Sequence, residues 1–334
     1  MTQSNTRLED LAKMAGVSTS TVSRALNDHP LISLKTKKKI WALARENHYP
    51  FRSSMPAAPL GSEGSIVVVT PHMQGRPLPL SHPFFLELLA SIGEAARARD
   101  CDFTVSHTAP RDFDDLVAVT TTSRAKGVIF LGQSMLHDEF NRLADSNGNF
   151  VVWGAHLPGQ KYRSVGSDNL LGGRRATLHL LRLGRRRIAF LGSSDPEAMQ
   201  RRQGYLEALE SSGVAFDPAL DVRVDFGFES AESAAAKLLA RGQEIDGIVA
   251  TSDLIALGAI RALRKGGRAV PKDVSVVGYD DMLLARLSTP ALTTIQQDTA
   301  EAGRRLVSQV MDSDSEQPPE YLPTNLIVRE SCGA

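Results

Sequence analysis

The sequence has few of the features that mark secreted or membrane-embedded proteins. Two of its 334 residues are cysteine, Cys101 and Cys332, which excludes a disulfide scaffold and a cysteine-rich zinc site and fits a reducing compartment. No apolar run approaches the roughly 20 residues that a membrane span needs. The opening residues MTQSNTRLEDLAKMAG contain no apolar core of a secretory signal. We therefore expect a cytoplasmic protein with no membrane partner.

Motifs of catalysis and nucleotide binding are missing as well. The chain contains neither HExxH nor GxSxG, and its cysteines and histidines do not have metal-ligand spacing. Gly172 and Gly173 are adjacent, but the GK[ST] of a phosphate-binding loop does not follow them. Asp280 and Asp281 are neighbours in sequence, which does not by itself make an acid–base pair. We expect no enzymatic activity, no metal and no cofactor.

The net charge of zero hides an uneven distribution of charge. Lysine plus arginine and aspartate plus glutamate number 38 each. Residues 1–53 hold nine basic and four acidic side chains, which gives +5 there and leaves −5 for the rest of the chain. A basic segment joined to an acidic one indicates that the basic segment meets a polyanion such as nucleic acid. Chance clustering on a solvated surface is the alternative that charge alone leaves open.

The pattern of residues 1–50 predicts three short helices. The first has apolar residues at helical spacing and ends at Gly16. Ser18 can cap a second helix that begins at Thr19, and Ser33 can cap a third, strongly basic one. Together these helices predict a compact, all-α DNA-binding domain over residues 1–52.

From Ser65 onward, apolar runs of strand length alternate with helical stretches. The runs are Ile66–Val69, Phe103–Val105, Val128–Leu131, Phe150–Trp153, Ile188–Leu191, Ile248–Ala250 and Val274–Val277. Alternating strands and helices predict an α/β fold with parallel sheets flanked by helices, and residues 65–334 are too many for one small sheet. We expect two similar lobes, one of approximately residues 65–165 and 296–324 and the other of 166–295 and 325–334. Ligands of such folds bind at the carboxyl ends of strands, and here also between the lobes.

The segment LEDLAKMAGVSTSTVSRALN, from Leu8 to Asn27, has the pattern of a helix-turn-helix. A helix that enters the major groove exposes small or polar residues on its first turns. The residues of this kind here are Thr19, Ser20, Ser23 and Arg24. Ser18 and Thr21 can donate hydrogen bonds to phosphates, as can the backbone N–H groups at the start of the helix. A plain helical hairpin is the alternative.

Several motifs then follow in a fixed order along the chain. They are AGVSTSTVSRALN near the N-terminus and, further on, HPFFLELLASIGEAA, SDNLLGG, LGRRRIAFLG, ATSDLIALGAIRAL, VPKDVSVVGYDD, TPALTTIQQD and LPTNLIVRES. In this order they resemble the lactose-repressor/galactose-repressor (LacI/GalR) family of bacterial transcription regulators. The resemblance implies a helix-turn-helix domain, a hinge, and a two-lobed body like that of periplasmic sugar-binding proteins. It also implies operator binding as a dimer and control by a small effector.

The resemblance further implies which side chains contact DNA. Thr19, Ser20 and Arg24 match positions that read operator bases. The residues that match positions contacting the DNA backbone are Arg7, Leu8, Ser23, Asn27 and Thr36. Arg7 departs from the family, which usually has threonine at that position.

The linker at residues 53–64 departs from the family more strongly. The family's hinge helix reads Ala-Arg-x-Leu, and its leucine wedges into the minor groove, whereas this chain has Met55–Ala58 at those positions. Pro56 and Pro59 disfavour a helix, and alanine is a poor wedge. We expect that this hinge does not fold and kink DNA in the usual way. The alternative is that Met55 or Leu60 provides the wedge.

By the same resemblance, an effector site lies between the lobes. Arg201 matches an arginine that grips the ligand, Asp280 an acceptor for sugar hydroxyls, and Phe226 an aromatic ring that stacks on the ligand. The residues that complete the set are Phe84, Phe85, Trp153, Asp253 and Gln297. Aromatic faces and bidentate polar groups suit a pyranose ring, which has apolar C–H faces and a rim of hydroxyls. Asp253 has the alternative role of capping the helix that follows it, and Trp153 that of core packing.

These features predict a sequence-specific DNA-binding regulator that is not an enzyme. The most specific interpretation is a repressor of carbohydrate-utilisation genes that binds a palindromic operator as a homodimer and responds to a sugar-like effector. We expect a dimer and not a tetramer, because the sequence after the motif LPTNLIVRES has no room for a leucine heptad. The alternatives are a sugar-binding protein, which would need no DNA-binding domain, and a regulator that responds to a non-sugar metabolite such as a nucleobase.

Overall fold

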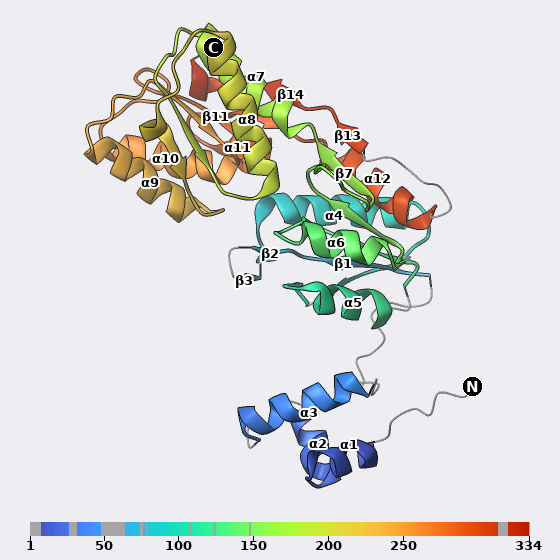
Figure 1. Cartoon of the computed structure of the whole chain (residues 1–334). Coiled ribbons are helices and arrows are strands. Elements are labelled where there is room, and N and C mark those ends of the chain that lie inside the picture. The colour runs from blue at the N-terminus through green and yellow to red at the C-terminus, as the bar shows by residue number, and fades with distance from the viewer. Residues whose placement is uncertain are drawn as a thin grey trace. The chain divides into compact units, whose positions relative to one another are not determined.

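The structure is a computed structural model of the chain. It describes residues 8–26, 32–47, 64–73, 76–77, 79–106, 108–122, 125–146, 148–312 and 320–333. The chain divides into two compact units, Met1–Leu60 and Gly61–Ala334 (Figure 1). Three predictions lie outside the described residues: the DNA contacts Arg7 and Asn27, and residues 53–63 of the linker with both of its prolines.

Residues 8–26 and 32–47 of the N-terminal unit form three helices, as the sequence predicts. They are α1 (Leu8–Ala15), α2 (Thr19–Leu26) and α3 (Leu34–Glu46). Gly16 adopts φ of +70°, a left-handed conformation that glycine tolerates and that ends α1. Buried side chains from all three helices form one hydrophobic core. They are Leu11, Ala12, Ala15, Val22, Ala25, Ile40 and Ala44.

The first lobe of the larger unit contains a six-stranded, fully parallel sheet. Its strands, in the order β13-β7-β6-β5-β1-β4, are β13 (Glu320–Leu322), β7 (Ser164–Ser167), β6 (Phe150–Trp153), β5 (Gly127–Phe130), β1 (Ile66–Val69) and β4 (Phe103–Ser106). Helices α4 (Pro83–Arg97) and α12 (Thr299–Met311) pack together over one face. On the other face, Phe140 of α6 (His137–Ala144) contacts Phe130 and Phe150, and α5 (Phe113–Thr122) packs beside α6.

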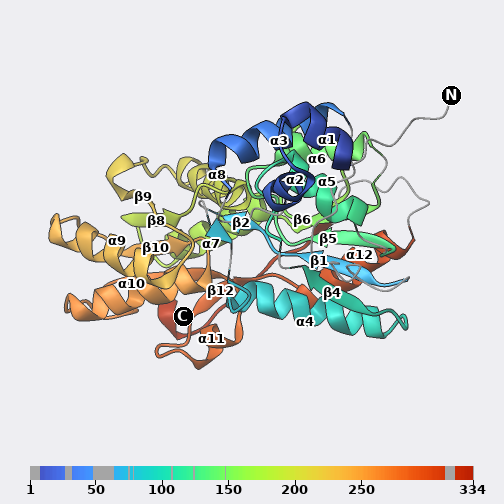
Figure 2. The same ribbon diagram turned by 90° about the horizontal axis from the view of Figure 1, so that it is seen from below.

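The second lobe repeats this plan. Its strands, in the order β14-β12-β11-β10-β8-β9, are β14 (Asn325–Ile327), β12 (Thr293–Gln296), β11 (Ser275–Asp280), β10 (Gly247–Ala250), β8 (Ile188–Gly192) and β9 (Asp221–Arg223), and β14 alone of these runs antiparallel. Helices α7 (Asn169–Arg182) and α8 (Pro196–Ser211) pack together on one face, and α9 (Phe228–Ala240) and α10 (Asp253–Lys265) on the other (Figure 2). The remaining elements are β2 (His72–Met73), β3 (Arg76–Pro77), α11 (Leu283–Leu287) and two short 3₁₀ helices, Pro218–Leu220 and Glu330–Cys332.

The chain passes from one lobe to the other three times. It crosses after β7, after β12 and between β13 and β14. The predicted α/β class, with two lobes of mainly parallel strands, is therefore confirmed. Because the strands of each sheet other than β14 run parallel, their carboxyl ends gather at one edge, where ligands of open α/β sheets bind.

Candidate functional site

The N-terminal unit presents one polar helix surface. Ser18 caps α2, since its hydroxyl accepts a hydrogen bond from the backbone N–H of Thr21 at 3.2 Å. Val22 and Ala25 are buried in the core, while the predicted contact residues Ser18, Thr19, Ser20 and Arg24 are exposed. The remaining described candidates, Leu8, Thr21, Ser23 and Thr36, are half-buried. The capping role predicted for Ser33 is also present, because its hydroxyl accepts from the N–H of Thr36 at 3.2 Å.

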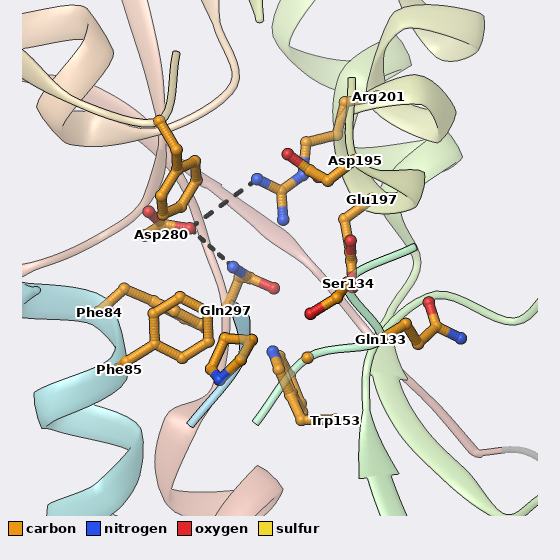
Figure 3. Close-up of a pocket in the computed structure, with 13 residues that line it drawn as sticks. Phe84, Phe85, Gln133, Ser134, Trp153, Asp195, Glu197, Arg201, Asp280 and Gln297 are labelled. Atoms are coloured by element: carbon orange, nitrogen blue, oxygen red, sulfur yellow. Dashed lines mark hydrogen bonds and ion pairs between the residues drawn. The ribbon is translucent and has the colours of Figure 1, made fainter. Parts of the chain in front are cut away.

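The larger unit has a cavity of about 490 Å³, part of it open to solvent, between its two lobes. The cavity is lined by Pro71, Phe84, Phe85, Gly132, Gln133, Ser134, Trp153, Asp195, Glu197, Arg201, Phe226, Asp280 and Gln297 (Figure 3). Most of these residues end a strand or follow one: β1, β5 and β6 of the first sheet, and β8, β11 and β12 of the second.

Arg201 of α8 is held by four groups of the second lobe. Its Nε donates to Oδ1 of Asn169 at 2.8 Å, and its Nη1 donates to the carbonyl oxygen of Thr251 at 2.5 Å. The guanidinium carbon lies 3.6 Å from the centre of the Tyr279 ring, and Nη1 lies 4.0 Å from Oδ1 of Asp280. Arg201 is 7% exposed, so these contacts orient a nearly buried cation at the wall of the cavity.

Asp280 ends β11 beneath Arg201. Its Oδ1 accepts a hydrogen bond from Nε2 of Gln297 at 2.7 Å, whereas its buried Oδ2 has no hydrogen-bond partner among the described residues. Burial raises the pKa of Asp280 to about 7, although the nearby charge of Arg201 opposes this shift. A buried carboxylate oxygen without a partner is unfavourable, so a ligand that donates a hydrogen bond to it is stabilised there.

Aromatic side chains form the opposite wall of the cavity. Phe84 and Phe85 begin α4, with ring centroids 5.3 Å apart, and Trp153 at the end of β6 lies 6.0 Å from Phe84. Phe226 approaches them from the second lobe, 6.3 Å from Phe85. The structure thus brings together seven of the eight predicted effector residues around one cavity (Figure 3).

Asp253 is the exception, because it does not line the cavity. It is completely buried, and its carboxylate accepts hydrogen bonds from the N–H of Met282 at 2.8 Å and the hydroxyl of Thr294 at 2.6 Å. The capping role is also wrong for this residue: Ser252 caps α10, and Asp253 is the first helical residue. Asp253 therefore ties the segment after β11 to β12, beneath the site and not in it.

Four polar residues of the cavity were not predicted from the sequence. Gln133 and Ser134 follow β5, Asp195 follows β8, and Glu197 lies on the first turn of α8. Polar residues directly after parallel strands are the signal that was available for the first three. Glu197 was detectable by its spacing, since it precedes Arg201 by four residues and so shares its helix face.

Comparison with known proteins decides the family. Residues 7–50 match the family described as "Bacterial regulatory proteins, lacI family", and residues 177–332 match "Periplasmic binding protein-like domain". The HTH-type transcriptional regulator CelR of Thermobifida fusca is 33% identical over 97% of both chains. The chain belongs to the lacI family of bacterial regulators. The HTH-type transcriptional regulator DegA of Bacillus subtilis is 31% identical over 98% of both chains.

Solved structures of other lacI-family regulators share this fold. A complex of the transcriptional regulator CelR with cellobiose is 30% identical, with a TM-score of 0.71 over 98% of this chain and 100% of that one. The lac repressor dimer bound to operator and the anti-inducer ONPF is 25% identical, with a TM-score of 0.70 over 99% and 100%. This lacI-family protein is accordingly a DNA-binding transcriptional regulator and not an enzyme.

The side chains around the cavity of this lacI-family regulator include aromatic, amide, carboxyl and guanidinium groups. Across the described ranges, no group of three or more His, Cys, Asp or Glu side chains is placed to hold a metal ion. No helix in the described part of the chain is long and apolar enough to span a bilayer. What remains is a cavity with one aromatic wall, one buried arginine and several carboxyl groups, which can stack on a ring and accept hydrogen bonds from its substituents.

Proposed function

We propose that this regulator is a repressor of carbohydrate-utilisation genes whose DNA affinity is controlled by a sugar bound between the lobes. The observation that carries the proposal is the composition of the cavity. Four aromatic rings face a guanidinium, a carboxyl and an amide that are fixed by hydrogen bonds to one another or to the second lobe. Such a site matches a ring with apolar faces and hydroxyl edges. The cellobiose bound by the related CelR supports the same ligand class.

We assign DNA recognition to residues 1–52 and effector binding to residues 65–334. Within the first, Thr19, Ser20 and Arg24 read bases, and Ser18, Thr21, Ser23 and Thr36 hold the DNA backbone together with Arg7, Leu8 and Asn27. The exposed, capped start of α2 supports this assignment, because a helix entering the major groove presents its N-terminal turn to the bases.

A homodimer would place two such helices on the two halves of a palindromic operator. We place its interface at exposed leucines of α4 and α11: Leu86 is 51% exposed, Leu283 56% and Leu287 69%. The two helices are near each other, since the charge of Arg286 on α11 lowers the pKa of Glu87 on α4, against the larger raising effect of burial. Clustered apolar side chains on a surface are typical of protein–protein contacts. Leu283→Glu with Leu287→Glu should therefore shift light scattering from dimer to monomer mass, and an unchanged mass would reject this interface.

The effector is found by a thermal-shift screen of the purified full chain. The panel contains cellobiose, other mono- and disaccharides, and nucleosides as the non-sugar alternative. A hit is then titrated into a complex of the protein with fluorescent operator DNA selected from a random palindromic library. A sugar that raises Tm and changes operator affinity supports the proposal, whereas a response to a nucleoside alone overturns the sugar assignment.

The variant Arg201→Ala tests whether the response of operator binding to sugar depends on the cavity. Removal of a charge-assisted partner from a desolvated site costs about 1.5–3 kcal/mol, or roughly ten- to a hundredfold in affinity. The variant should keep its operator affinity without sugar and lose the response to sugar. Arg202→Ala is the matched control, because Arg202 follows on the same helix but pairs with Asp221, outside the cavity. Identical sugar midpoints for wild type and Arg201→Ala would reject the site.

A further inference from the structure

The turn that follows β11 has an unusual backbone conformation. Asp280 has φ of +116° and Asp281 has φ of +59°, although neither residue is glycine. Residues other than glycine rarely adopt positive φ, because their Cβ atom then crowds the backbone carbonyl groups. Such a conformation persists only where the surrounding contacts impose it, and it is frequent at functional sites. Here it occurs at Asp280, which lines the cavity.

Side chains that are distant in sequence hold this turn in place. The carboxylate of Asp281 pairs with Nη2 of Arg329 at 2.5 Å, and its Oδ2 accepts a hydrogen bond from Nε2 of Gln296 at 3.1 Å. The backbone N–H of Asp281 donates to the hydroxyl of Thr294 at 3.4 Å. Both oxygens of the Asp281 side chain and its backbone N–H are therefore engaged, which fixes the second residue of the turn.

Arg329 is the charged partner of the turn, and its own position is well determined. It follows β14, where its Nη1 donates to the carbonyl oxygen of Leu292 at 2.8 Å and its backbone N–H donates to the hydroxyl of Thr293 at 2.8 Å. The side chains of Arg329 and Asp281 are 14% and 11% exposed. A largely buried ion pair with these further hydrogen bonds restrains the turn more firmly than a surface pair would.

The conformation of the turn decides where the carboxylate of Asp280 points. In the structure this carboxylate lies 2.7 Å from Nε2 of Gln297 and 4.0 Å from Nη1 of Arg201. Rotation about the N–Cα bond changes the direction of Cβ relative to the strand, so a turn released to negative φ would carry the carboxylate away from both groups. Arg329 does not line the cavity itself. Its effect on a ligand would therefore pass through the turn.

We propose that Arg329 is a positioning residue of the effector site: through Asp281 it holds the turn in its strained conformation and so directs the carboxylate of Asp280 at the ligand. This inference rests on the proposed sugar effector, because the ligand group that Asp280 binds is a sugar hydroxyl.

The first test is isothermal titration calorimetry of the full chain with cellobiose and with glucose. Arg329→Met should weaken binding about tenfold or more, since a misdirected Asp280 loses a charge-assisted hydrogen bond to the sugar. Asp281→Asn should have a similar effect, and the double variant should bind no more weakly than either single variant, because both changes remove the same link. Arg329→Lys keeps a cation near Asp281 and should retain most of the affinity.

Arg185→Met is the matched control. Arg185 also ties segments of the second lobe together, but at the opposite end of β11: its Nε donates to the hydroxyl of Ser275 at 3.0 Å and its Nη2 to the carbonyl oxygen of Pro271 at 2.8 Å. Arg329→Met and Arg185→Met should both lower Tm, whereas only Arg329→Met should weaken sugar binding. Unchanged sugar affinity in Arg329→Met, or an equal loss in Arg185→Met, overturns the positioning role.

A second measurement, made without ligand, separates this inference from the proposed function. Carboxyl-carbon NMR of aspartate-labelled protein follows Asp280, whose signal is assigned by its absence in Asp280→Asn. Burial raises the pKa of Asp280 to about 7, and a released turn should let this pKa fall toward its ordinary value of 3.8 in Arg329→Met but not in Arg185→Met. An unchanged pKa of Asp280 in Arg329→Met overturns the positioning role. The expected fall in pKa without binding of either sugar supports the positioning of Asp280 and counts against the sugar effector.

Discussion

The imidazole of His82 stacks on the ring of Phe226, with centroids 4.6 Å apart and planes 20° from parallel. His82 directly precedes α4 in the first lobe, and Phe226 lies between β9 and α9 in the second. The pair therefore joins the lobes beside the cavity, which Phe226 lines. Burial lowers the pKa of His82 to about 4, so the ring is neutral near pH 7.

Removal of this stack should weaken effector binding. An aromatic pair contributes about 0.5–1.5 kcal/mol beyond the area that it buries, so His82→Ala should reduce sugar affinity roughly two- to tenfold. The expected reason is that a closed arrangement of the lobes becomes less populated before the ligand arrives. Calorimetric titration measures the effect, and Phe216→Ala, a substitution of an aromatic residue 39% exposed in the second lobe, serves as the control. Equal affinities for wild type and His82→Ala would show that the stack does not assist closure.

Apolar patterning located the strands that are hydrophobic and missed those that are not. All seven predicted runs form strands. β7 was not predicted because its sequence is SVGS, although every residue in it is buried. The hydroxyl of Ser164 finds its partner only in the fold, where Gln160 Nε2 donates to it at 2.6 Å. Hydrophobicity cannot identify a buried strand in which two of the four residues are serine.

The sequence also predicted some residues of the site correctly and others not. Arg201 and Asp280 were chosen by resemblance, and they do face each other in the cavity. The alternative capping role of Asp253 was wrong, because Ser252 and Asp253 are both good capping residues and sequence does not say which of two neighbours caps. The direction of the Asp253 carboxylate depends on Thr294, 41 residues away.

The raised pKa of Asp280 makes effector affinity depend on pH. Below about pH 7 this carboxyl is protonated in the free protein, and it must ionise to accept two hydrogen bonds from sugar hydroxyls. Affinity for a neutral sugar should therefore rise between pH 6 and pH 8. His82 cannot cause this change, since its pKa is lowered to about 4. Titrations across this range test the prediction, and affinity that falls as pH rises would contradict it.

Glu197 should make the stability of the folded protein fall as pH rises, whereas effector affinity is expected to rise. The folded protein holds a proton on Glu197 up to about pH 8, whereas the unfolded chain releases it near the ordinary value of 4.5. Because the folded state then binds more protons, this group's contribution to stability falls as pH rises from 4.5 to 8. Glu197→Gln removes the titration, so its Tm relative to wild type should increase over that interval. A Tm difference that stays constant from pH 5 to pH 8.5 would show that Glu197 ionises normally.

Arg24 should determine which operator sequence is bound. A bidentate contact between arginine and guanine contributes about 1–3 kcal/mol of discrimination, so Arg24→Ala should lose specific retardation of the selected palindrome and keep sugar binding. Lys35→Ala provides the comparison, because an exposed lysine at the start of the basic helix α3 should weaken all DNA sequences alike and flatten the salt dependence. Gel retardation at several salt concentrations separates the two effects. Preserved operator preference in Arg24→Ala would remove Arg24 from the base-reading set.

Gly173 of α7 lies directly against the backbone of Arg201 in α8 and so helps to fix the position of Arg201. A Cβ added at Gly173 would overlap the backbone carbonyl of Arg201, and one added at Gly204 of α8 would overlap the carbonyl oxygen of Leu170 in α7. The two helices therefore meet backbone to backbone, which is possible because glycine has no side chain. Gly173→Ala must push α8 outward and displace Arg201 from Asn169, so sugar affinity should fall at least tenfold and Tm should decrease.

Gly184→Ala is the control for Tm: Gly184 also lies near α7, has φ of +84° and has open space around it, so its substitution strains the backbone without moving α8. Calorimetry on both variants separates the two effects. Both substitutions should lower Tm, but only Gly173→Ala should also weaken sugar binding. If both variants bind sugar as wild type does, the contact between α7 and α8 does not position Arg201.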